Sequence, residues 1–412
     1  MARRFLYTIL MYLLGMGLAN SQKSLIDSIR HELRIAPNDT IRLLRYMDLV
    51  RTYAEVNPDT SYFYGEKALN ISRYLGLRID EGHAMAEMGY ALLNAGNYPR
   101  SLQTFIASLA IAEEKSSEQK VLKGEYKTLD EFYDRQEDPH MQRIELIARI
   151  RQYMGILYLN AGNFQKSLDN YNVSRDLAEE TGNKYLQSII YSTIGRVYLS
   201  LKMPDSAMAA EQHAYDIGVE IGLKKYMGSI LLNLARIHAF QGNDSLAQVY
   251  FRKARQKSAE QSYFRGVVSS SLFIADYFKR MGNADSSLYY IESALDVARG
   301  LNSPDLLLRG YTALADHYKL NRNSDSAVRY QSMIIQINDS LFNSKQAQQF
   351  QNIDFDEAQR KQQIETAKAS YKEKIRRNLL LAGLGVFLLL AIILWRNSLQ
   401  RKKANRLLSQ QN

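Results

Sequence analysis

Residues 89–109 read GYALLNAGNYPRSLQTFIASL, and residues 155–175 read GILYLNAGNFQKSLDNYNVSR. Both stretches have a glycine eight residues before the last Asn of NAGN, a serine four residues after it and a second serine eleven residues after it. We take this Asn as the anchor of a repeated unit. The anchor position recurs at Asn57, Asn97, Asn163, Met203, Asn243, Asn283 and Asn323. Every gap between anchors is 40 residues except the second, which is 66, so the sequence predicts about seven copies of one structural unit.

Small side chains recur at fixed positions of this unit. They stand eight residues before the anchor at Gly89, Gly155 and Gly195, four after it at Ala207 and Ala247, and eleven after it at Ala254 and Ala294. Small residues let two antiparallel helices approach closely, while larger residues between them fill the core. A glycine just before most anchors suits the left-handed end of a first helix. An aspartate two residues after several anchors, such as Asp205, suits the start of a second helix, where an acceptor caps free N–H groups.

This pattern resembles the tetratricopeptide repeat, in a 40-residue form in place of the usual length of about 34. The resemblance covers residues 41–342 and implies an all-α, right-handed solenoid of about seven helix-turn-helix repeats. A helical cap is expected before it, over residues 22–40. The sequence departs from the family pattern in two ways, because the first repeat lacks the first-helix glycine and the proline usual at the repeat end is absent. The long gap places 26 extra residues within 115–142, where either an additional helix or a surface loop is expected.

Both ends of the chain are predicted to be directed to a membrane. Residues 1–21 resemble a signal peptide, with two arginines before a long apolar stretch, and an uncleaved anchor helix is the alternative. Residues 378–396 contain the uncharged run LLLAGLGVFLLLAIILW, which predicts a single transmembrane helix. Basic residues flank this run equally, so they do not orient it. Export through the signal peptide then predicts a periplasmic repeat domain anchored in the cytoplasmic membrane, with a short cytoplasmic tail over residues 397–412.

The segment between the repeats and the predicted span, residues 343–377, is rich in Gln and Lys and has no glycine or proline. Ile364, Ala367, Tyr371 and Ile375 recur every three or four residues, which predicts a linker helix with one apolar seam. Such a helix can transmit movement or pair with a second copy in a homodimer, as in a coiled coil. A simple spacer helix is the alternative.

Composition excludes several classes of chemistry. The chain has no cysteine, which removes disulfides, thiolate metal sites and cysteine nucleophiles. Its net charge is +10, but residues 23–342 carry 38 acidic and 38 basic side chains, so the excess lies at the two ends and nucleic acid is not expected as a partner. The sequence has no phosphate-binding loop, zinc-protease motif or calcium loop, and its six histidines are scattered. We therefore expect no enzyme activity, catalytic site, metal or cofactor, and we interpret His238 as a packing residue.

The concave face that solenoids use to hold peptides is the candidate binding surface. One position of the first helix, seven residues before the anchor, is expected to line it. This position holds Tyr90, Ile156, Arg196, Arg236, Asp276 and Asp316. One interpretation is a groove with a basic half and an acidic half that orients an extended peptide of a protein partner. The alternative is an ion pair between neighbouring repeats, Arg236 with Asp276, in a solvated wall.

The exported repeats, the Gln/Lys-rich helix, the single span and the basic start KKANRLL together resemble the sensor half of bacterial membrane-bound histidine kinases and related regulators. This resemblance implies ligand recognition for signal transduction. No histidine follows the span, so kinase activity does not carry over to this chain. We expect either a product truncated before its output domain or a member that has lost that domain. The alternative function is a static periplasmic scaffold of the cell envelope without a signalling role.

Overall fold

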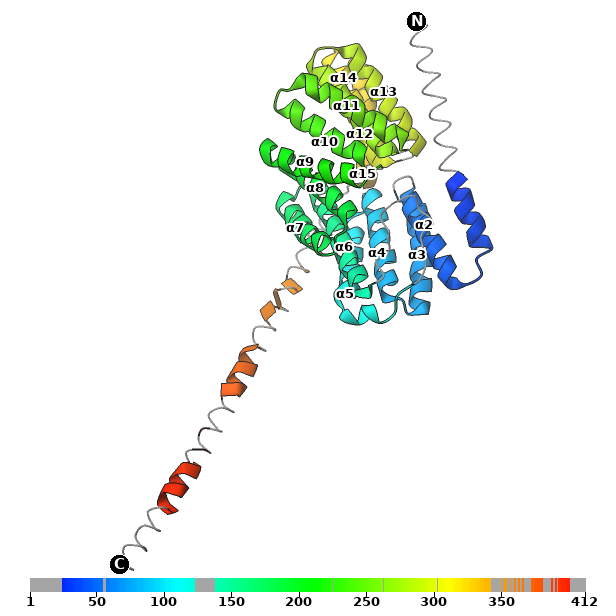
Figure 1. Ribbon diagram of the computed structural model, residues 1–412. Helices are drawn as coiled ribbons and strands as arrows, with labels where there is room; N and C mark the ends of the chain where they lie inside the picture. The colour runs from blue at the N-terminus through cyan, green and yellow to red at the C-terminus, as the bar shows by residue number, and fades with distance from the viewer. Residues whose placement is uncertain are drawn as a thin grey trace, which may run out of the picture. The chain divides into compact units, whose positions relative to one another are not determined.

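The computed structural model describes residues 24–54, 57–122, 138–224, 226–261, 263–301 and 303–341, and scattered positions between 349 and 400. The chain divides into two units, Met1–Phe350 and Gln351–Asn412. The first unit contains the repeats, whose helices are labelled in Figure 1.

Each repeat consists of a first and a second helix, preceded by a helical stretch over residues 24–34. The first helices are α2 (Asp39–Tyr53), α4 (Arg78–Asn94), α6 (Pro139–Asn160), α8 (Lys184–Ser200), α10 (Met227–Phe240), α12 (Phe264–Arg280) and α14 (Pro304–Leu320). The second helices are α3 (Pro58–Leu75), α5 (Tyr98–Glu113), α7 (Phe164–Glu180), α9 (Pro204–Glu220), α11 (Asp244–Glu260), α13 (Ala284–Leu301) and α15 (Ser324–Leu341). From the second repeat to the seventh, the two helices of a repeat contact each other more extensively than they contact other helices, while α3 of the first repeat contacts α2 and α4 about equally. The predicted all-helical solenoid of helix-turn-helix units is therefore confirmed.

The turn inside each repeat from the second to the seventh has one left-handed residue just before the anchor. This residue has a φ between 72° and 78° at Gly96, Gly162, Gly242 and Gly282. Two repeats place a side chain there instead, with φ values of 61° at Lys202 and 58° at Arg322. Glycine adopts this region without the steric cost that a Cβ atom adds. The predicted left-handed helix end is therefore present even where the glycine is not.

The caps of several second helices differ from the prediction. Where Asp59 and Asp285 were expected to cap, the anchor Asn does so: Asn57 Oδ1 accepts a hydrogen bond from the backbone N–H of Thr60 at 3.0 Å, and Asn283 Oδ1 accepts one from Ser286 at 3.0 Å. The aspartates that were expected to cap lie inside the first turn of their helices, as Asp205 does in α9. A side chain already inside the helix contributes its charge to the helix dipole, whereas the flanking residue supplies the capping oxygen.

The small residues of the repeat lie where its two helices meet. A Cβ atom on Gly89 would lie 2.5 Å from the ring of Phe105, and one on Gly155 would lie 2.6 Å from the ring of Tyr171. The serine four residues after the anchor also bonds to the partner helix, because Ser101 Oγ donates to the carbonyl of Gly89 at 2.7 Å. The alanines at the small positions are fully buried at Ala207, Ala247, Ala254 and Ala294. At each of these sites a small residue therefore lets the two helices of a repeat pack closely, and at several of them a serine hydroxyl also donates a hydrogen bond to a backbone carbonyl of the partner helix.

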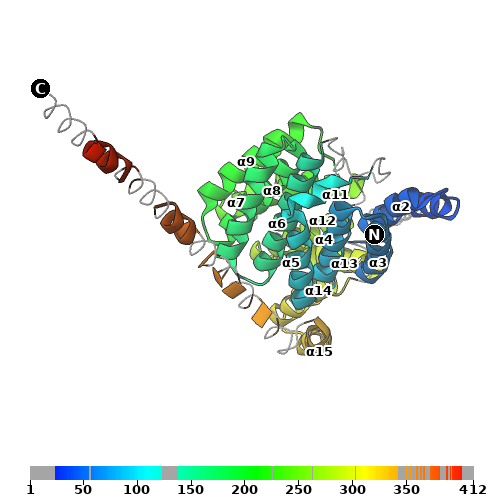
Figure 2. The same ribbon diagram turned by 90° about the horizontal axis from the view of Figure 1, so that it is seen from below.

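The curvature of the stack follows from which helices touch. Neighbouring first helices contact one another directly along the series from α2 to α14, whereas the described second helices contact first helices. Adjacent repeats are therefore closer on the first-helix side. The first helices form the inner face of the curved stack, and Figure 2 shows the repeats following one another around it.

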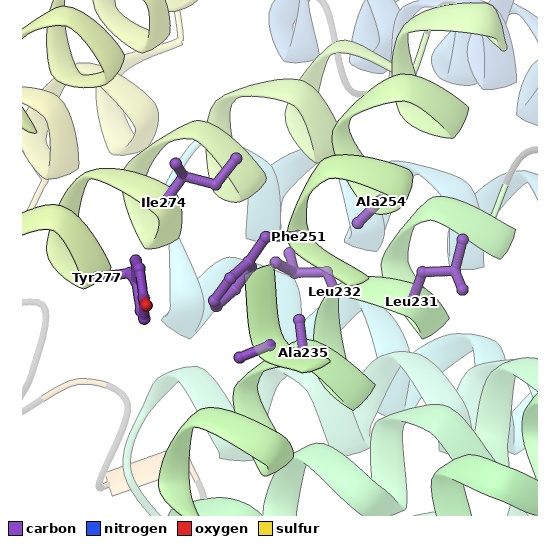
Figure 3. Close-up of a cluster of buried hydrophobic side chains, with 8 residues drawn as sticks. Leu231, Leu232, Ala235, Phe251, Ala254, Ile274 and Tyr277 are labelled. Carbon is purple, nitrogen blue, oxygen red and sulfur yellow. The ribbon is translucent and has the colours of Figure 1, made fainter. Parts of the chain in front are cut away.

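The hydrophobic core continues from one repeat to the next. Figure 3 shows a cluster in which Leu232 of α10, Phe251 of α11 and Ile274 of α12 lie together, so two repeats share one set of buried side chains. His238 stacks on Tyr250 of α11 with ring centroids 5.4 Å apart and is half-buried. Sharing of this kind makes the stability of each repeat depend on its neighbours.

The irregular gap in the repeat series falls between α5 and α6. A short 3₁₀ helix covers Lys115–Gln119, and residues 123–137 lie outside the described residues. The next first helix, α6, begins at Pro139 and is 22 residues long, against 17 in α8. Part of the extra sequence therefore lengthens a first helix.

Several predictions on the chain ends fall outside the described residues. These include residues 1–21, most of the seam in residues 343–377, and the central part of the predicted span, residues 381–386. In the second unit, residues 372–380 and 392–400 are helical. Within the described positions, no helix combines the length and the apolar character needed to cross a lipid bilayer.

Candidate functional site: the inner face of the first helices

The side chains predicted to bind a partner lie on successive first helices. Tyr90 is in α4, Arg196 in α8, Arg236 in α10, Asp276 in α12 and Asp316 in α14. Ile156 occupies the same position of α6. The aromatic, aliphatic and basic members are half-buried, whereas the two aspartates are exposed. The burial of the side chain at this repeat position therefore differs from one repeat to another.

Tyr90 packs between the first helices α4 and α6. Its ring stacks on Tyr153 of α6, with centroids 4.6 Å apart and planes 13° apart. The Tyr153 hydroxyl lies 3.2 Å from a carboxylate oxygen of Glu87, and both of these residues are buried. Tyr90 thus covers a buried polar contact between α4 and α6, and stacking of this kind is worth about 0.5–1.5 kcal/mol.

Arg236 contacts neutral groups. Its guanidinium carbon lies 4.5 Å from the centroid of the Phe273 ring in α12, and its Nη1 donates to Asn233 Oδ1 at 3.4 Å. Burial lowers the pKa of Arg236, the positive charges of Arg196 and Arg309 act in the same direction and Glu211 opposes them, which leaves the pKa at about 10. A buried cation beside like charges is the arrangement that an opposite charge would stabilise most.

The predicted ion pair between Arg236 and Asp276 is not formed, so that interpretation is wrong. Asp276 instead pairs within α12, with Lys279 at 2.8 Å and Arg280 at 3.6 Å. Arg236 lies over Phe273, which precedes Asp276 by about one helical turn. Residues three and four apart on one helix are neighbours, so the local partners of Asp276 prevail over the arginine of the next repeat.

A third arginine joins Arg196 and Arg236 on the inner face. Arg309 stands seven residues before Asp316 in α14 and is exposed, and its Nη1 donates to Ser269 Oγ of α12 at 3.1 Å. We call Arg196, Arg236 and Arg309 the arginine cluster. Within the described residues, none of the three forms an ion pair with a carboxylate.

The sequence offered one signal for Arg309 that was not used. A helix places residues seven apart on the same face, so the position fourteen residues before the anchor lines the inner face as well. A shared face alone does not bring Arg309 close to Arg196 and Arg236, because the stack of repeats must also curve. Arg309 of α14 contacts Ser269 of α12, about one helical turn from the Phe273 ring that Arg236 of α10 covers.

A buried carboxyl group, Glu211, lies behind the arginine cluster. Its position in the repeat holds Phe105, Tyr171 and Phe251 in other units, so a carboxyl replaces a core aromatic ring. Glu211 is fully buried, and its Oε1 accepts hydrogen bonds from Ser192 Oγ at 2.6 Å and from Asn233 Nδ2 at 3.4 Å.

Burial raises the pKa of Glu211 well above its usual value, against the opposing effects of Ser192, Asn233, Arg196 and Arg236. Its Oε2 has no hydrogen-bond partner among the described residues. A Cβ atom on Gly195 would lie 2.7 Å from this oxygen, so the small residue makes room for the carboxyl. A group in these surroundings favours its neutral, protonated form.

Comparison with known proteins supports the fold. Residues 146–218 match the family model of the tetratricopeptide repeat. None of the curated proteins matches the chain. The crystal structure of a Rap protein complexed with competence and sporulation factor is 12% identical, with a TM-score of 0.53, and the match covers 69% of this chain and 72% of that one.

Two further structures are similar at lower scores. The apo form of RapI is 17% identical, with a TM-score of 0.49 and coverage of 71% of this chain and 98% of that one. A tetratricopeptide repeat protein from Parabacteroides merdae is 14% identical, with a TM-score of 0.41 and coverage of 72% and 99%. Taken with the helix pairs and their shared core, the matched repeats and the common fold support a tetratricopeptide repeat protein.

Proposed function

We propose that the chain binds a protein partner through the inner face of its first helices and acts by binding without catalysis. The observation that carries this proposal is the series of side chains at one repeat position of the curved face, where Asp276 and Asp316 are exposed. Curved faces of helical solenoids present such series to extended ligands. A solved solenoid of the same fold is in complex with competence and sporulation factor, which supports the proposal at the level of the fold.

Site-specific photocrosslinking tests this proposal without assuming the chemistry of the partner. A benzophenone amino acid replaces Asp316 on the inner face or, as the control, Arg252 on the second helix α11, and both residues are exposed. Irradiation of cells that produce the full-length chain should give a discrete crosslinked product at Asp316 and not at Arg252. Equal products at both positions, or a product at Arg252 alone, would refute binding through the inner face.

We further propose that this binding domain is exported and anchored in the cytoplasmic membrane, as the sensory half of a signal-transduction protein. The sequence of residues 1–21 and the apolar run within 378–396 support this arrangement. Protease added to spheroplasts should degrade the repeats, and the same protease should spare them if the domain lies inside the cell.

The alternative is a static periplasmic scaffold. The substitution Ile364→Pro, which interrupts the predicted linker helix, distinguishes this scaffold from a sensor. A sensor should lose its downstream response and keep its partner, whereas a scaffold should be unaffected.

A further inference from the structure

We propose that the arginine cluster is the docking site for an acidic segment of the partner, an extended peptide with carboxylates three residues apart that bridges α8, α10 and α14. This inference rests on the proposed function, because it names the chemistry of the partner that the inner face would bind. The sequence predicted two residues of the cluster, Arg196 and Arg236, as site residues. The third residue, Arg309, was found from the structure.

The described contacts of the arginine cluster are with neutral groups and include no carboxylate. Arg236 is supported by the face of Phe273 and by an amide oxygen, and Arg309 by a hydroxyl group. These partners are neutral, so the positive charges of the cluster are not compensated by an ion pair within the described residues. Guanidinium groups bind carboxylates through two parallel hydrogen bonds, and like charges held together gain most from such a ligand.

The spacing of the cluster favours an extended chain. Arg196 and Arg236 occupy the same repeat position on neighbouring inner helices, and packed helices are about 8–10 Å apart. An extended peptide in polyproline II geometry advances by about 3.1 Å per residue and brings every third side chain to the same face, so carboxylates three residues apart match that separation. Arg309 reaches the same region from α14, because it donates to Ser269 of α12, about one helical turn from the Phe273 ring over which Arg236 lies. One short acidic segment can therefore contact all three guanidinium groups.

Charges around the cluster limit the ligand to a short acidic stretch. Residues 23–342 carry balanced charge, so the domain as a whole does not attract a polyanion. Asp276 and Asp316 are exposed at the next two copies of the position that holds Arg196 and Arg236. A long polyanion would meet these carboxylates, whereas a peptide with a few acidic residues would avoid them.

The test uses fluorescence anisotropy with the full-length chain in mild detergent. The probe is a fluorescein-labelled peptide, Gly-Glu-Gly-Gly-Glu-Gly-Gly-Glu-Gly, and the control probe has Gln at each Glu position. We expect the Glu probe to bind more tightly than the Gln probe. Arg196→Gln, Arg236→Gln and Arg309→Gln should each weaken binding of the Glu probe by about tenfold, since each removes one charge-assisted contact. The matched control Arg252→Gln, on the second helix α11, should leave it unchanged.

Bridging across repeats gives a second readout. The Glu probe should raise the melting temperature of the wild-type chain, because a ligand that binds only the folded state stabilises it. At the same probe concentration it should raise that of Arg309→Gln by less. This measurement also shows that each variant is folded.

Four outcomes decide the inference. Equal binding of the Glu and Gln probes would refute it, and so would unchanged binding by all three variants. Binding of inorganic phosphate that the Glu probe does not displace would assign the cluster to a free anion and refute a peptide. Crosslinking at Asp316 without binding of the Glu probe would leave the proposed function intact and refute the acidic class alone.

Discussion

Glu211 gives the sharpest test of the charges inside this solenoid, through the substitution Glu211→Gln. Burial raises the pKa of the folded carboxyl, so the native chain keeps a proton that the unfolded chain releases above about pH 4.3. The free energy of unfolding of the wild-type chain should then fall by about 1.4 kcal/mol for each pH unit between the unfolded and the folded pKa. The glutamine carries no such proton, and it can keep the acceptor for Ser192.

The expected result is a difference in stability that grows with pH. Urea unfolding followed by circular dichroism, at pH 5, 6, 7 and 8, should show Glu211→Gln gaining on the wild-type chain by up to about 1.4 kcal/mol per unit. Other titrating groups contribute equally to both proteins and cancel in the difference. Glu211→Ala should show the same pH dependence, displaced downward by the loss of packing.

A constant difference across this pH range would refute the reasoning. It would mean that Glu211 is ionised in the folded chain and serves as the counter-ion of Arg196 and Arg236. In that case Glu211→Gln should destabilise the protein at every pH, because two half-buried cations would lose their opposite charge.

Three further predictions concern the repeat itself and are measured by thermal unfolding. Gly89→Ala should lower stability by about 1–3 kcal/mol, because the added Cβ would lie 2.5 Å from Phe105, whereas the control Gly300→Ala, with open space around it, should stabilise by about 0.5–1 kcal/mol. Ser101→Ala should cost about 1 kcal/mol through the lost bond to the Gly89 carbonyl, and no cost would show that the hydroxyl contributes nothing. Lys202→Gly should stabilise by about 0.5–1 kcal/mol, since it relieves a left-handed side chain, and a loss would contradict the role of the turn.

The sequence was sufficient for the repeat because its signals are local. A glycine before the anchor and small residues at fixed offsets determine one turn and one helix pair, and the structure places Gly96 and Ala254 accordingly. The capping residue was assigned wrongly where an aspartate was expected, since the anchor Asn57 and not Asp59 supplies the oxygen. That error is one of register by two residues.

The candidate site was predicted only in part, because it depends on curvature and side-chain direction. A repeat position says which residues share a face, but it does not say that Arg236 would lie over Phe273 and leave Asp276 to its own helix. Arg309 joins the cluster from three repeats away, which no local pattern records. Glu211 was overlooked because the position was not compared between repeats.

The last helix of the solenoid has a consequence for dynamics. None of the side chains described in α15 is buried, and Val328 and Ile335 are 66% and 56% exposed. In a linear array each unit is held by its neighbours, so an end supported from one side has the smallest free energy of local opening. Amide hydrogen exchange should therefore be fastest in α15 among the second helices. Local unfolding of this one helix would leave a flexible segment directly before residues 343–377, while the rest of the array stays folded.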